Sequence, residues 1–268
     1  MGKGSPLRVA VAGLGAVGMA VVRALEAGLP GCELAAVSAR DLGAARARLP
    51  RAVPVLPVEE LEPLADLVVE AAPAALLPAV AAPFLSAGKG VVVLSAGALL
   101  RNDHLIALAR ERGGQITVPT GALIGLDAVA AAAEGVIHSV RMVTRKPVRG
   151  LAGAPYLIEN GIEIEGIGEP LRVFRGTPRE AAVGFPANLN VAVALSLAGI
   201  GPDRTELEIW ADPALARNVH SIAVESDSAN FTMSIENLPS ENPKTGRITA
   251  LSVIACLRKM GAPLRVGT

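Results

Sequence analysis

The sequence is poor in aromatic residues, cysteine and histidine, and it carries no excess charge of either sign. Only 2% of its 268 residues are Phe, Trp or Tyr, there are two cysteines and three histidines, and 25 Lys and Arg balance 25 Asp and Glu. Two cysteines cannot form a multi-bridge disulfide framework or a four-ligand metal cluster. A neutral chain has no global field that attracts phosphate or anionic lipid. We therefore expect no metal site and no nucleic-acid partner.

Long uninterrupted apolar runs are also missing. The most apolar stretch, Ala71–Leu85, is broken by Pro73, Pro78 and Pro83, so it is too short and too interrupted to span a membrane. The N-terminal apolar run is rich in glycine and continues into a helical pattern, which a signal peptide does not do. We expect a soluble cytoplasmic protein.

The composition and length favour a folded protein of two domains. Hydrophobic residues make up 51% of the chain and charged residues 19%, far from the composition of disordered proteins. At roughly 150 residues per domain, two domains are expected. We place a first domain at 1–120, a second at 121–240, and a C-terminal helix within 241–268 that packs back on the first domain.

The first part of the chain alternates short, β-branched apolar runs with helical stretches. This alternation is typical of βαβ units and predicts an α/β fold with a Rossmann-type, doubly wound parallel sheet. The expected strands are Leu7–Ala12, Glu33–Ser38, Ala52–Val55, Leu67–Ala71, Val91–Leu94 and Gln115–Val118. The expected helices are Ala16–Ala27, Leu42–Leu49, Ala74–Ser86 and Asp103–Arg112.

After Thr120 the pattern changes to longer alternating strands, which predict a mixed α/β domain with a one-sided, mostly antiparallel sheet. The expected strands are Ile137–Thr144, Leu171–Phe174, Glu206–Ala211, Asn218–Val224 and Asn230–Glu236, the last two in a hairpin that turns at Asp227 and Ser228. The expected helices are Leu123–Ala133, Leu189–Leu197 and, near the C-terminus, Thr245–Met260.

Gly13, Gly15 and Gly18 form a G-x-G-x-x-G pattern between the first expected strand and the first expected helix. In a dinucleotide-binding unit the first glycine makes the tight turn, the second admits the pyrophosphate, and the third lets the helix approach the strand. The helix N-terminus, at Ala16 and Val17, adds free amides and partial positive charge. In this context the pattern favours NAD or NADP binding over a tight turn without a ligand.

The residue that would choose between NAD and NADP is not the usual one. An acidic residue about 20 positions beyond the loop often binds the ribose hydroxyls, but the second strand ends in Ser38, Ala39, Arg40 and Asp41. Arg40 can meet a 2′-phosphate, or it can be a solvated arginine at a strand end. Asp41 can cap the next helix. The sequence leaves the cofactor preference open.

Three histidines are available for general acid/base chemistry. His104 lies in the first turn of a helix and His138 follows a glycine turn, so surface positions are expected for both. His220 begins an alternating strand, downstream of Asn188 and Asn190, which could border the same cleft. It is either a catalytic group, suited by an unperturbed pKa of about 6.5, or a half-buried polar residue.

Seven blocks of sequence together resemble the L-aspartate dehydrogenase family, and the similarity covers nearly the whole chain. The blocks are GLGAVG at 13–18, EAAP at 70–73, SAGAL at 95–99, PTGALIGLDAV at 119–129, TRKP at 144–147, FPANLNVAVALSLAGIG at 185–201 and NPKTGRITALSVIACLRKM at 242–260. The resemblance implies a homodimer and NAD(P)-dependent interconversion of L-aspartate with iminosuccinate, or with oxaloacetate plus ammonia, in supply of NAD biosynthesis.

The resemblance also implies roles for individual residues. His220 falls at the family's catalytic histidine. Cofactor contacts beyond the glycine loop are implied at Ala122 and Asn190, and we also expect them at Ala72, Ser95 and Gly121. For a substrate with two carboxylates, cations or amide donors are needed, and Arg145, Lys146 and Asn188 are the candidates. Arg145 and Lys146 can equally be surface charges.

Two other functions remain open. One is a different two-domain NAD(P) reductase of homoserine-dehydrogenase or dihydrodipicolinate-reductase type, which turnover of its own substrate would distinguish. The other is a non-enzymatic dinucleotide sensor, which would bind cofactor without turning over an amino or keto acid.

Overall fold

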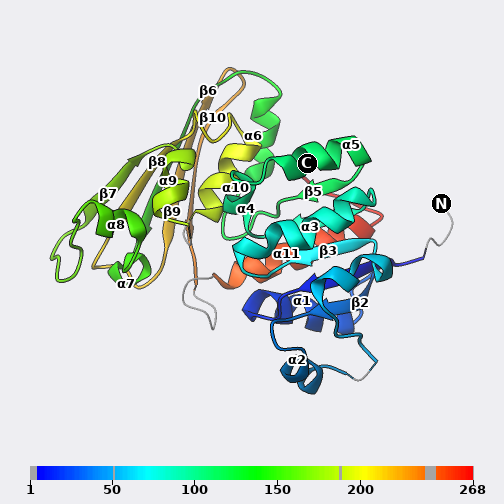
Figure 1. The fold of residues 1–268 in the computed structure, drawn as a ribbon. Helices are drawn as coiled ribbons and strands as arrows, with labels where there is room; N and C mark the ends of the chain where they lie inside the picture. The colour runs from blue at the N-terminus through cyan, green and yellow to red at the C-terminus, as the bar shows by residue number, and fades with distance from the viewer. Residues whose placement is uncertain (1–4, 51, 187–188, 239–245, 268) are drawn as a thin grey trace. The chain divides into compact units, whose positions relative to one another are not determined.

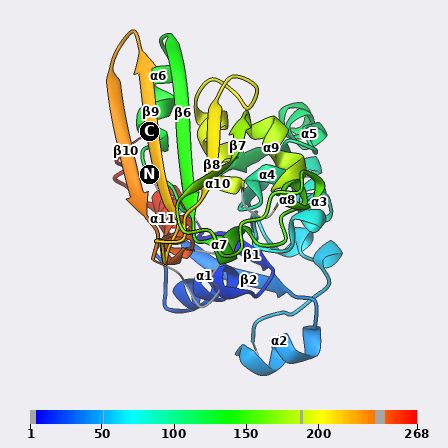
Figure 2. The ribbon, with the colours of Figure 1, turned by 90° about the vertical axis from the view of Figure 1, so that its left-hand side faces the viewer.

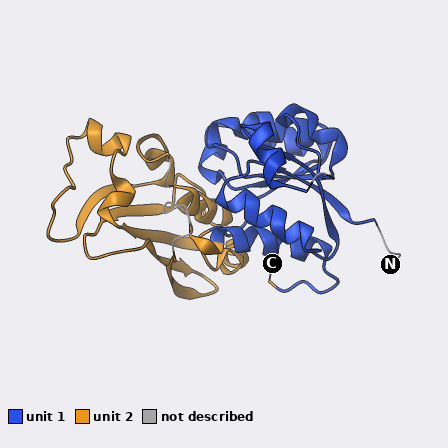
Figure 3. Ribbon diagram, turned by 90° about the horizontal axis from the view of Figure 1, so that it is seen from below, with its two compact units in different colours: residues 1–121, 249–266 blue, residues 122–248, 267–268 orange. Residues whose placement is uncertain are grey.

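The computed structural model of the chain describes residues 5–50, 52–186, 189–238 and 246–267. Figure 1 and Figure 2 show the ribbon from two directions, and Figure 3 colours its two compact units. Unit 1 comprises Met1–Gly121 and Thr249–Val266, and unit 2 comprises Ala122–Ile248 and Gly267–Thr268. In the part of the chain that is described, no helix is long and apolar enough to cross a bilayer.

Unit 1 is built on a five-stranded sheet in the order β2-β1-β3-β4-β5. The strands are β1 (Leu7–Ala12), β2 (Cys32–Ser38), β3 (Leu67–Glu70), β4 (Gly90–Val93) and β5 (Gln115–Thr117). Every pairing is parallel, which confirms the predicted parallel sheet. The order reverses direction at β1, and such a switch point is where ligands bind in doubly wound folds.

Helices cover both faces of this sheet. They are α1 (Ala16–Glu26), α2 (Leu42–Arg48), α3 (Leu77–Ser86), α4 (Ala96–Leu99), α5 (His104–Arg112) and α11 (Arg247–Gly261), with short 3-10 turns at Val58–Glu60, Glu62–Leu64 and Ala74–Leu76. Val9 and Val11 share a core with α1 and α11, whereas Ala10 and Ala12 share the opposite core with α3 and α5. Successive side chains of β1 thus point alternately into two apolar cores, as expected for a parallel sheet buried on both sides.

The predicted strand over Ala52–Val55 is wrong. Only Val55 pairs, through an isolated parallel bridge to Val37 of β2. Pro54 has no amide hydrogen to donate to a ladder. The bridge consists of the Val37 amide donating to the Pro54 carbonyl and the Leu56 amide donating to the Val37 carbonyl. The apolar run is therefore a loop that touches the edge of the sheet.

Unit 2 contains a second five-stranded sheet, in the order β10-β9-β6-β8-β7 (Figure 2). Its strands are β6 (Ile137–Lys146), β7 (Leu171–Gly176), β8 (Glu206–Ala211), β9 (Val219–Ser226) and β10 (Asn230–Glu236). The β6–β8 pairing is parallel and the others are antiparallel, which confirms the predicted mostly antiparallel sheet and its terminal hairpin.

One face of the second sheet is buried. Val140, Met142, Thr144 and Lys146 of β6 are buried, while Arg141 between them is exposed. The helices of this unit are α6 (Leu126–Ala133), α7 (Val148–Leu151), α8 (Pro155–Glu159), α9 (Pro178–Gly184) and α10 (Asn190–Ala198). A Cβ at Gly199, just after α10, would lie 3.1 Å from a methyl of Val129 in α6 and 3.5 Å from one of Val140, so α6 and α10 cover this face.

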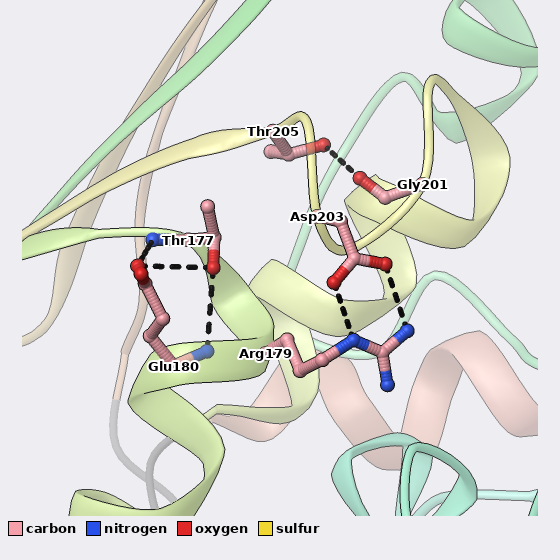
Figure 4. A network of polar contacts seen from close by, with 6 residues as sticks. All are labelled: Thr177, Arg179, Glu180, Gly201, Asp203 and Thr205. Atoms are coloured by element: carbon pink, nitrogen blue, oxygen red, sulfur yellow. Dashed lines mark hydrogen bonds and ion pairs between the residues drawn. The ribbon is translucent and has the colours of Figure 1, made fainter.

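Polar contacts at the start of α9 fix its position in unit 2 (Figure 4). Thr177 and Glu180 form a capping box, with each side chain accepting from the other's backbone amide. Arg179 makes a two-pronged ion pair with Asp203, in the loop between α10 and β8. Thr205 donates to the Gly201 carbonyl within that loop at 2.9 Å. The contacts join α9 to the segment that leads into β8.

Candidate active site

The glycine loop leaves β1 at the carboxyl edge of the parallel sheet and enters α1. Gly13 has φ of +101°, and a Cβ there would overlap the carbonyl oxygen of Ala71. A Cβ at Gly18 would overlap the Gly13 carbonyl oxygen. Gly13 is therefore required by the close approach of the β1–α1 turn to the segment after β3, and Gly18 by the close approach of α1 to Gly13, whatever the loop binds.

Gly15 is different, because nothing in the fold occupies the space beside it. No heavy atom of the described residues lies within 4 Å of the position that its Cβ would take. Its φ of −73° is open to any residue. Gly15 is the N-cap of α1, so no side chain accepts from the first amides, and Ala16 and Val17 bring no carboxylate to the first turn. This open, amide-lined turn fits the pyrophosphate of a dinucleotide.

Two further turns lie at the same edge of the sheet. Ala72 follows β3 and Ser95 follows β4, and both are connected to Glu70, the last residue of β3. The Glu70 carboxylate accepts from the Ser95 amide at 2.9 Å, from the Ser95 hydroxyl at 3.0 Å and from the Leu94 amide at 3.1 Å. The sequence-predicted residues Gly13, Ala72 and Ser95 are thus brought together in unit 1.

Arg40 and Asp41, which follow β2, have different roles in the structure. The Asp41 side chain caps α2 by accepting from the Ala44 amide at 2.9 Å, so its role as a helix cap is confirmed. Arg40 is exposed, next to the strand whose last residue, Ser38, accepts from the Gly13 amide at 2.8 Å. Arg40 thus follows a strand end that is hydrogen-bonded to the glycine loop.

The other predicted cofactor contacts are divided between the units. Gly121 ends its part of unit 1, with φ of +63° and its amide donating to the Ser252 hydroxyl of α11 at 3.0 Å. Ala122 and Asn190 belong to unit 2, where the Ala122 carbonyl accepts from the Asn237 side chain at 2.9 Å and Asn190 begins α10. Asn188, predicted to contact substrate, lies outside the described residues.

His220 lies on the buried face of the second sheet. It stands opposite Thr144 in the β6–β9 register, and its Nδ1 is 3.1 Å from the Thr144 hydroxyl oxygen. Only 2% of His220 is exposed, whereas His104 and His138 are exposed as predicted. The contact fixes the ring plane and leaves Nε2 as the nitrogen for other chemistry.

Lys146 ends β6 on the same face as His220. Burial lowers the pKa of Lys146 to about 8. Burial, followed by the positive charge of Lys146, lowers the pKa of His220 to about 3. The imidazole is therefore neutral at physiological pH and lies beside a buried ammonium, and this environment favours an anionic ligand.

Arg145 and Lys146 do not form a pair, because neighbouring residues of a strand point to opposite faces. Arg145 lies on the outer face, with its guanidinium 5.0 Å from the centre of the Trp210 ring and 3.4 Å from an Asp212 carboxylate oxygen. The same face holds Glu208, which accepts from Arg141 at 2.7 Å. The structure therefore groups Lys146, and not Arg145, with His220.

Sequence reasoning missed Thr144, Glu70 and Asn237. A signal for Glu70 was available, since it is a carboxylate at the end of the otherwise apolar strand Leu67–Glu70. The sequence contains no signal for the role of Thr144, because its contact with His220 depends on the register in which the two strands pair. Asn237, which is 4% exposed and holds the Ala122 carbonyl, depends likewise on a contact 115 residues away in sequence.

A doubly wound parallel sheet with an open, amide-lined glycine turn at its switch point defines a dinucleotide-binding protein, joined here to a second α/β unit. Two family models match the chain. Residues 13–119 match the homoserine dehydrogenase NAD-binding domain, and residues 127–260 match the C-terminal domain of aspartate dehydrogenase.

Individual relatives extend these matches over nearly the full chain. An L-aspartate dehydrogenase of Bradyrhizobium diazoefficiens is 60% identical over 98% of this chain and 95% of that protein. L-aspartate dehydrogenase 3 of Bordetella bronchiseptica is 61% identical over 98% of both. The crystal structure of aspartate dehydrogenase from Thermotoga maritima, 23% identical, shares the fold with a TM-score of 0.73 over 97% of this chain and 99% of that one. The chain belongs to the aspartate dehydrogenase family.

Proposed function

We propose that the protein is an NAD(P)-dependent L-aspartate dehydrogenase that supplies NAD biosynthesis. L-Aspartate loses a hydride from Cα and a proton from its amino group to give iminosuccinate, and water then replaces the imine nitrogen, releasing ammonia and oxaloacetate. The bound dinucleotide supplies the hydride acceptor. The observation that carries the proposal is the buried His220–Lys146 pair within residues 127–260, the region that matches the aspartate dehydrogenase model.

The reaction can be followed at 340 nm with purified protein. We expect NAD(P)H formation with L-aspartate, and NAD(P)H consumption with oxaloacetate plus ammonia. Turnover of homoserine or a dihydrodipicolinate, with none of aspartate, would instead support the alternative reductases. Cofactor binding without turnover of any of these substrates would support a dinucleotide sensor.

The cofactor site of the proposal is built mainly on unit 1. Its residues there are Gly13, Gly15, Ala16, Val17, Gly18, Arg40, Ala72, Ser95 and Gly121; the family resemblance also assigns cofactor contacts to Ala122 and Asn190, which belong to unit 2. The free amides of the loop support its contact with the pyrophosphate. Substrate binding is assigned to unit 2, through His220, Lys146 and Asn188.

Arg40→Ala tests the cofactor preference. The 2′-phosphate of NADP would pair with an exposed guanidinium at this strand end, whereas NAD has no such group. We expect the variant to lose affinity for NADP by more than it loses affinity for NAD, in titrations of both cofactors. Equal losses, or none, would place Arg40 outside the site.

Lys146 binds a substrate carboxylate in this proposal, and His220 handles protons. A dicarboxylate bound next to Lys146 would bring negative charge to this face, and would raise the affinity of the neighbouring imidazole for a proton. His220 can then accept a proton from the water that attacks the imine. Thr144 keeps the ring oriented through Nδ1.

Lys146→Met tests this role, because methionine is also long and unbranched but carries no charge. Hydrogen bonds to charged groups contribute about 1.5–3 kcal/mol, so we expect KM for L-aspartate to rise by roughly tenfold to a hundredfold. NAD(P) affinity should change little. Arg145→Met is the matched control, since it removes the neighbouring cation from the opposite face and should leave KM unchanged. The reverse pattern would assign the carboxylate to Arg145.

The oligomeric state and the location of the protein are further parts of the proposal. We propose a cytoplasmic homodimer that acts on the small molecules L-aspartate, oxaloacetate and ammonia and has no nucleic-acid partner. The balance of 25 basic and 25 acidic residues supports the last point. Sedimentation equilibrium would show the dimer as a mass of twice 27.3 kDa, and a mass of one chain would contradict it.

A further inference from the structure

Glu70 is a buried carboxyl group to which the proposed reaction assigns no step. It ends β3, between Ala12 of β1 and Val93 of β4 in the parallel register, and 0% of the residue is exposed. Among the described residues, no arginine, lysine or histidine forms an ion pair with it. A buried carboxylate without a cation costs free energy, so its presence requires an explanation.

Hydrogen-bond donors surround the Glu70 carboxyl group. The Leu94 and Ser95 amides donate to Oε2, the Ser95 hydroxyl donates to Oε1, and the Ala72 amide is a fourth donor. Backbone amides cannot reverse their direction, so this arrangement suits the ionised form, which only accepts hydrogen bonds. Burial opposes ionisation and raises the pKa of Glu70 to about 7, although these hydrogen bonds lower it.

The groups that Glu70 holds lie beside the glycine loop. Ala72 and Ser95 are residues of the proposed cofactor site. Between Glu70 and Ala72, the carbonyl of Ala71 lies so close to Gly13 that no Cβ fits there. A displacement of the turn after β3 would therefore reach the glycine loop directly.

We propose that Glu70 is a positioning residue of the dinucleotide site: its ionised carboxylate holds the turns at Ala72 and Ser95 in the arrangement that accepts the cofactor, so that cofactor affinity depends on the charge of this side chain. The inference rests on the proposed function for dinucleotide binding. Around Glu70 the groups from β1, β4 and the two turns are Ala12, Val93, Leu94, Ser95 and Ala72, none of which titrates between pH 5 and 9.

Glu70→Gln tests the proposal, because glutamine has the same shape but no charge, and its amide can still accept from the two backbone amides. We expect the wild-type protein to bind NAD at least about tenfold more tightly than the variant at pH 8.5, where Glu70 is ionised. At pH 5.5 the two affinities should be nearly equal, since Glu70 is then protonated. NAD is the probe because the 2′-phosphate of NADP would itself titrate in this range.

Two further variants separate this role from a general structural one. Ser95→Ala removes a hydrogen bond that favours the ionised form, so the midpoint of the pH dependence of NAD affinity should move to higher pH. Glu33→Gln, at an exposed glutamate of β2 in the same unit, should leave affinity unchanged at every pH. A wild-type to Glu70→Gln affinity ratio of one at both pH values would overturn the proposal.

Thermal unfolding of the cofactor-free protein gives an independent measurement. Folded Glu70 has a higher pKa than the 4.5 of an unperturbed glutamate, so the folded state keeps its proton while the unfolded state loses it. The contribution of Glu70 to the free energy of unfolding of the wild type therefore falls as pH rises from 4.5 to about 7. Glu70→Gln should melt several degrees above wild type at pH 8.5, with the difference vanishing toward pH 4.5.

The failures of the two proposals are distinguishable. A wild-type protein that binds neither NAD nor NADP at any pH would overturn both. A wild-type protein that binds NAD, together with equal affinities in Glu70→Gln at both pH values, would overturn only the role of Glu70. A difference in melting temperature between the two proteins that stays the same from pH 4.5 to pH 8.5 would show that Glu70 does not ionise in this range, and would overturn the proposal as well.

Discussion

Replacement of His220 by alanine is expected to lower kcat for L-aspartate oxidation by at least about a hundredfold, the lower end of what general acid/base groups contribute. The side chain is buried, and its Nδ1 is held by the Thr144 hydroxyl. Steady-state kinetics at 340 nm measure the change. NAD(P) affinity, measured on the same preparation, should survive because the glycine loop belongs to unit 1.

The control for this prediction is His138→Ala. His138 lies on β6 of the same sheet but is exposed, so its removal should leave kcat unchanged. If His220 were only a buried strand residue, its truncation would lower the melting temperature and leave kcat per folded molecule near that of wild type. That outcome would falsify the catalytic role.

Gly15→Val is expected to abolish measurable NAD(P) binding in a protein that still folds. The extended backbone at Gly15 accepts any residue, and the space beside it is open in the fold. Branched methyl groups would fill the volume that the pyrophosphate needs and would cover the first amides of α1. Isothermal titration with both cofactors and a melting curve measure the two parts of the prediction.

Gly168→Val is the matched control, because Gly168 also has open space beside it but lies in a loop of unit 2. It should bind cofactor as the wild type does. Unchanged cofactor affinity in folded Gly15→Val would overturn the assignment of the glycine loop, whereas a fall in affinity in both variants would point to a general effect on folding.

The sequence determined the elements whose signals are local. The bounds of β8 and β10 follow from alternation between turn residues, those of β1 follow from a short apolar run before the glycine turn, and all three match the structure. Gly13, Gly15 and Gly18 identify the β1–α1 turn because their spacing between a strand and a helix specifies it. The same signals predicted a strand at Ala52–Val55 that does not form. Pro54 has no amide hydrogen, and only Val55 of this apolar run pairs, through an isolated bridge.

The sequence alone could also have predicted that Arg145 and Lys146 lie on opposite faces of the sheet. An alternating strand places adjacent residues on opposite faces, so the two cations could not both face one substrate. The sequence could not say which face would be buried. That depended on α6 and α10, which cover the side of the sheet with Val140.

Tertiary structure alone decided the surroundings of the ionisable groups. Thr144 reaches His220 only because β6 and β9 pair in one register, across 76 residues of sequence. Glu70 receives its amide donors from the end of β4, 24 and 25 residues further along the chain, because parallel strands bring their carboxyl ends together. The sequence specifies which chemical groups are present. Their charge states depend on burial and on partners that lie far away in the sequence, and folding alone brings these together.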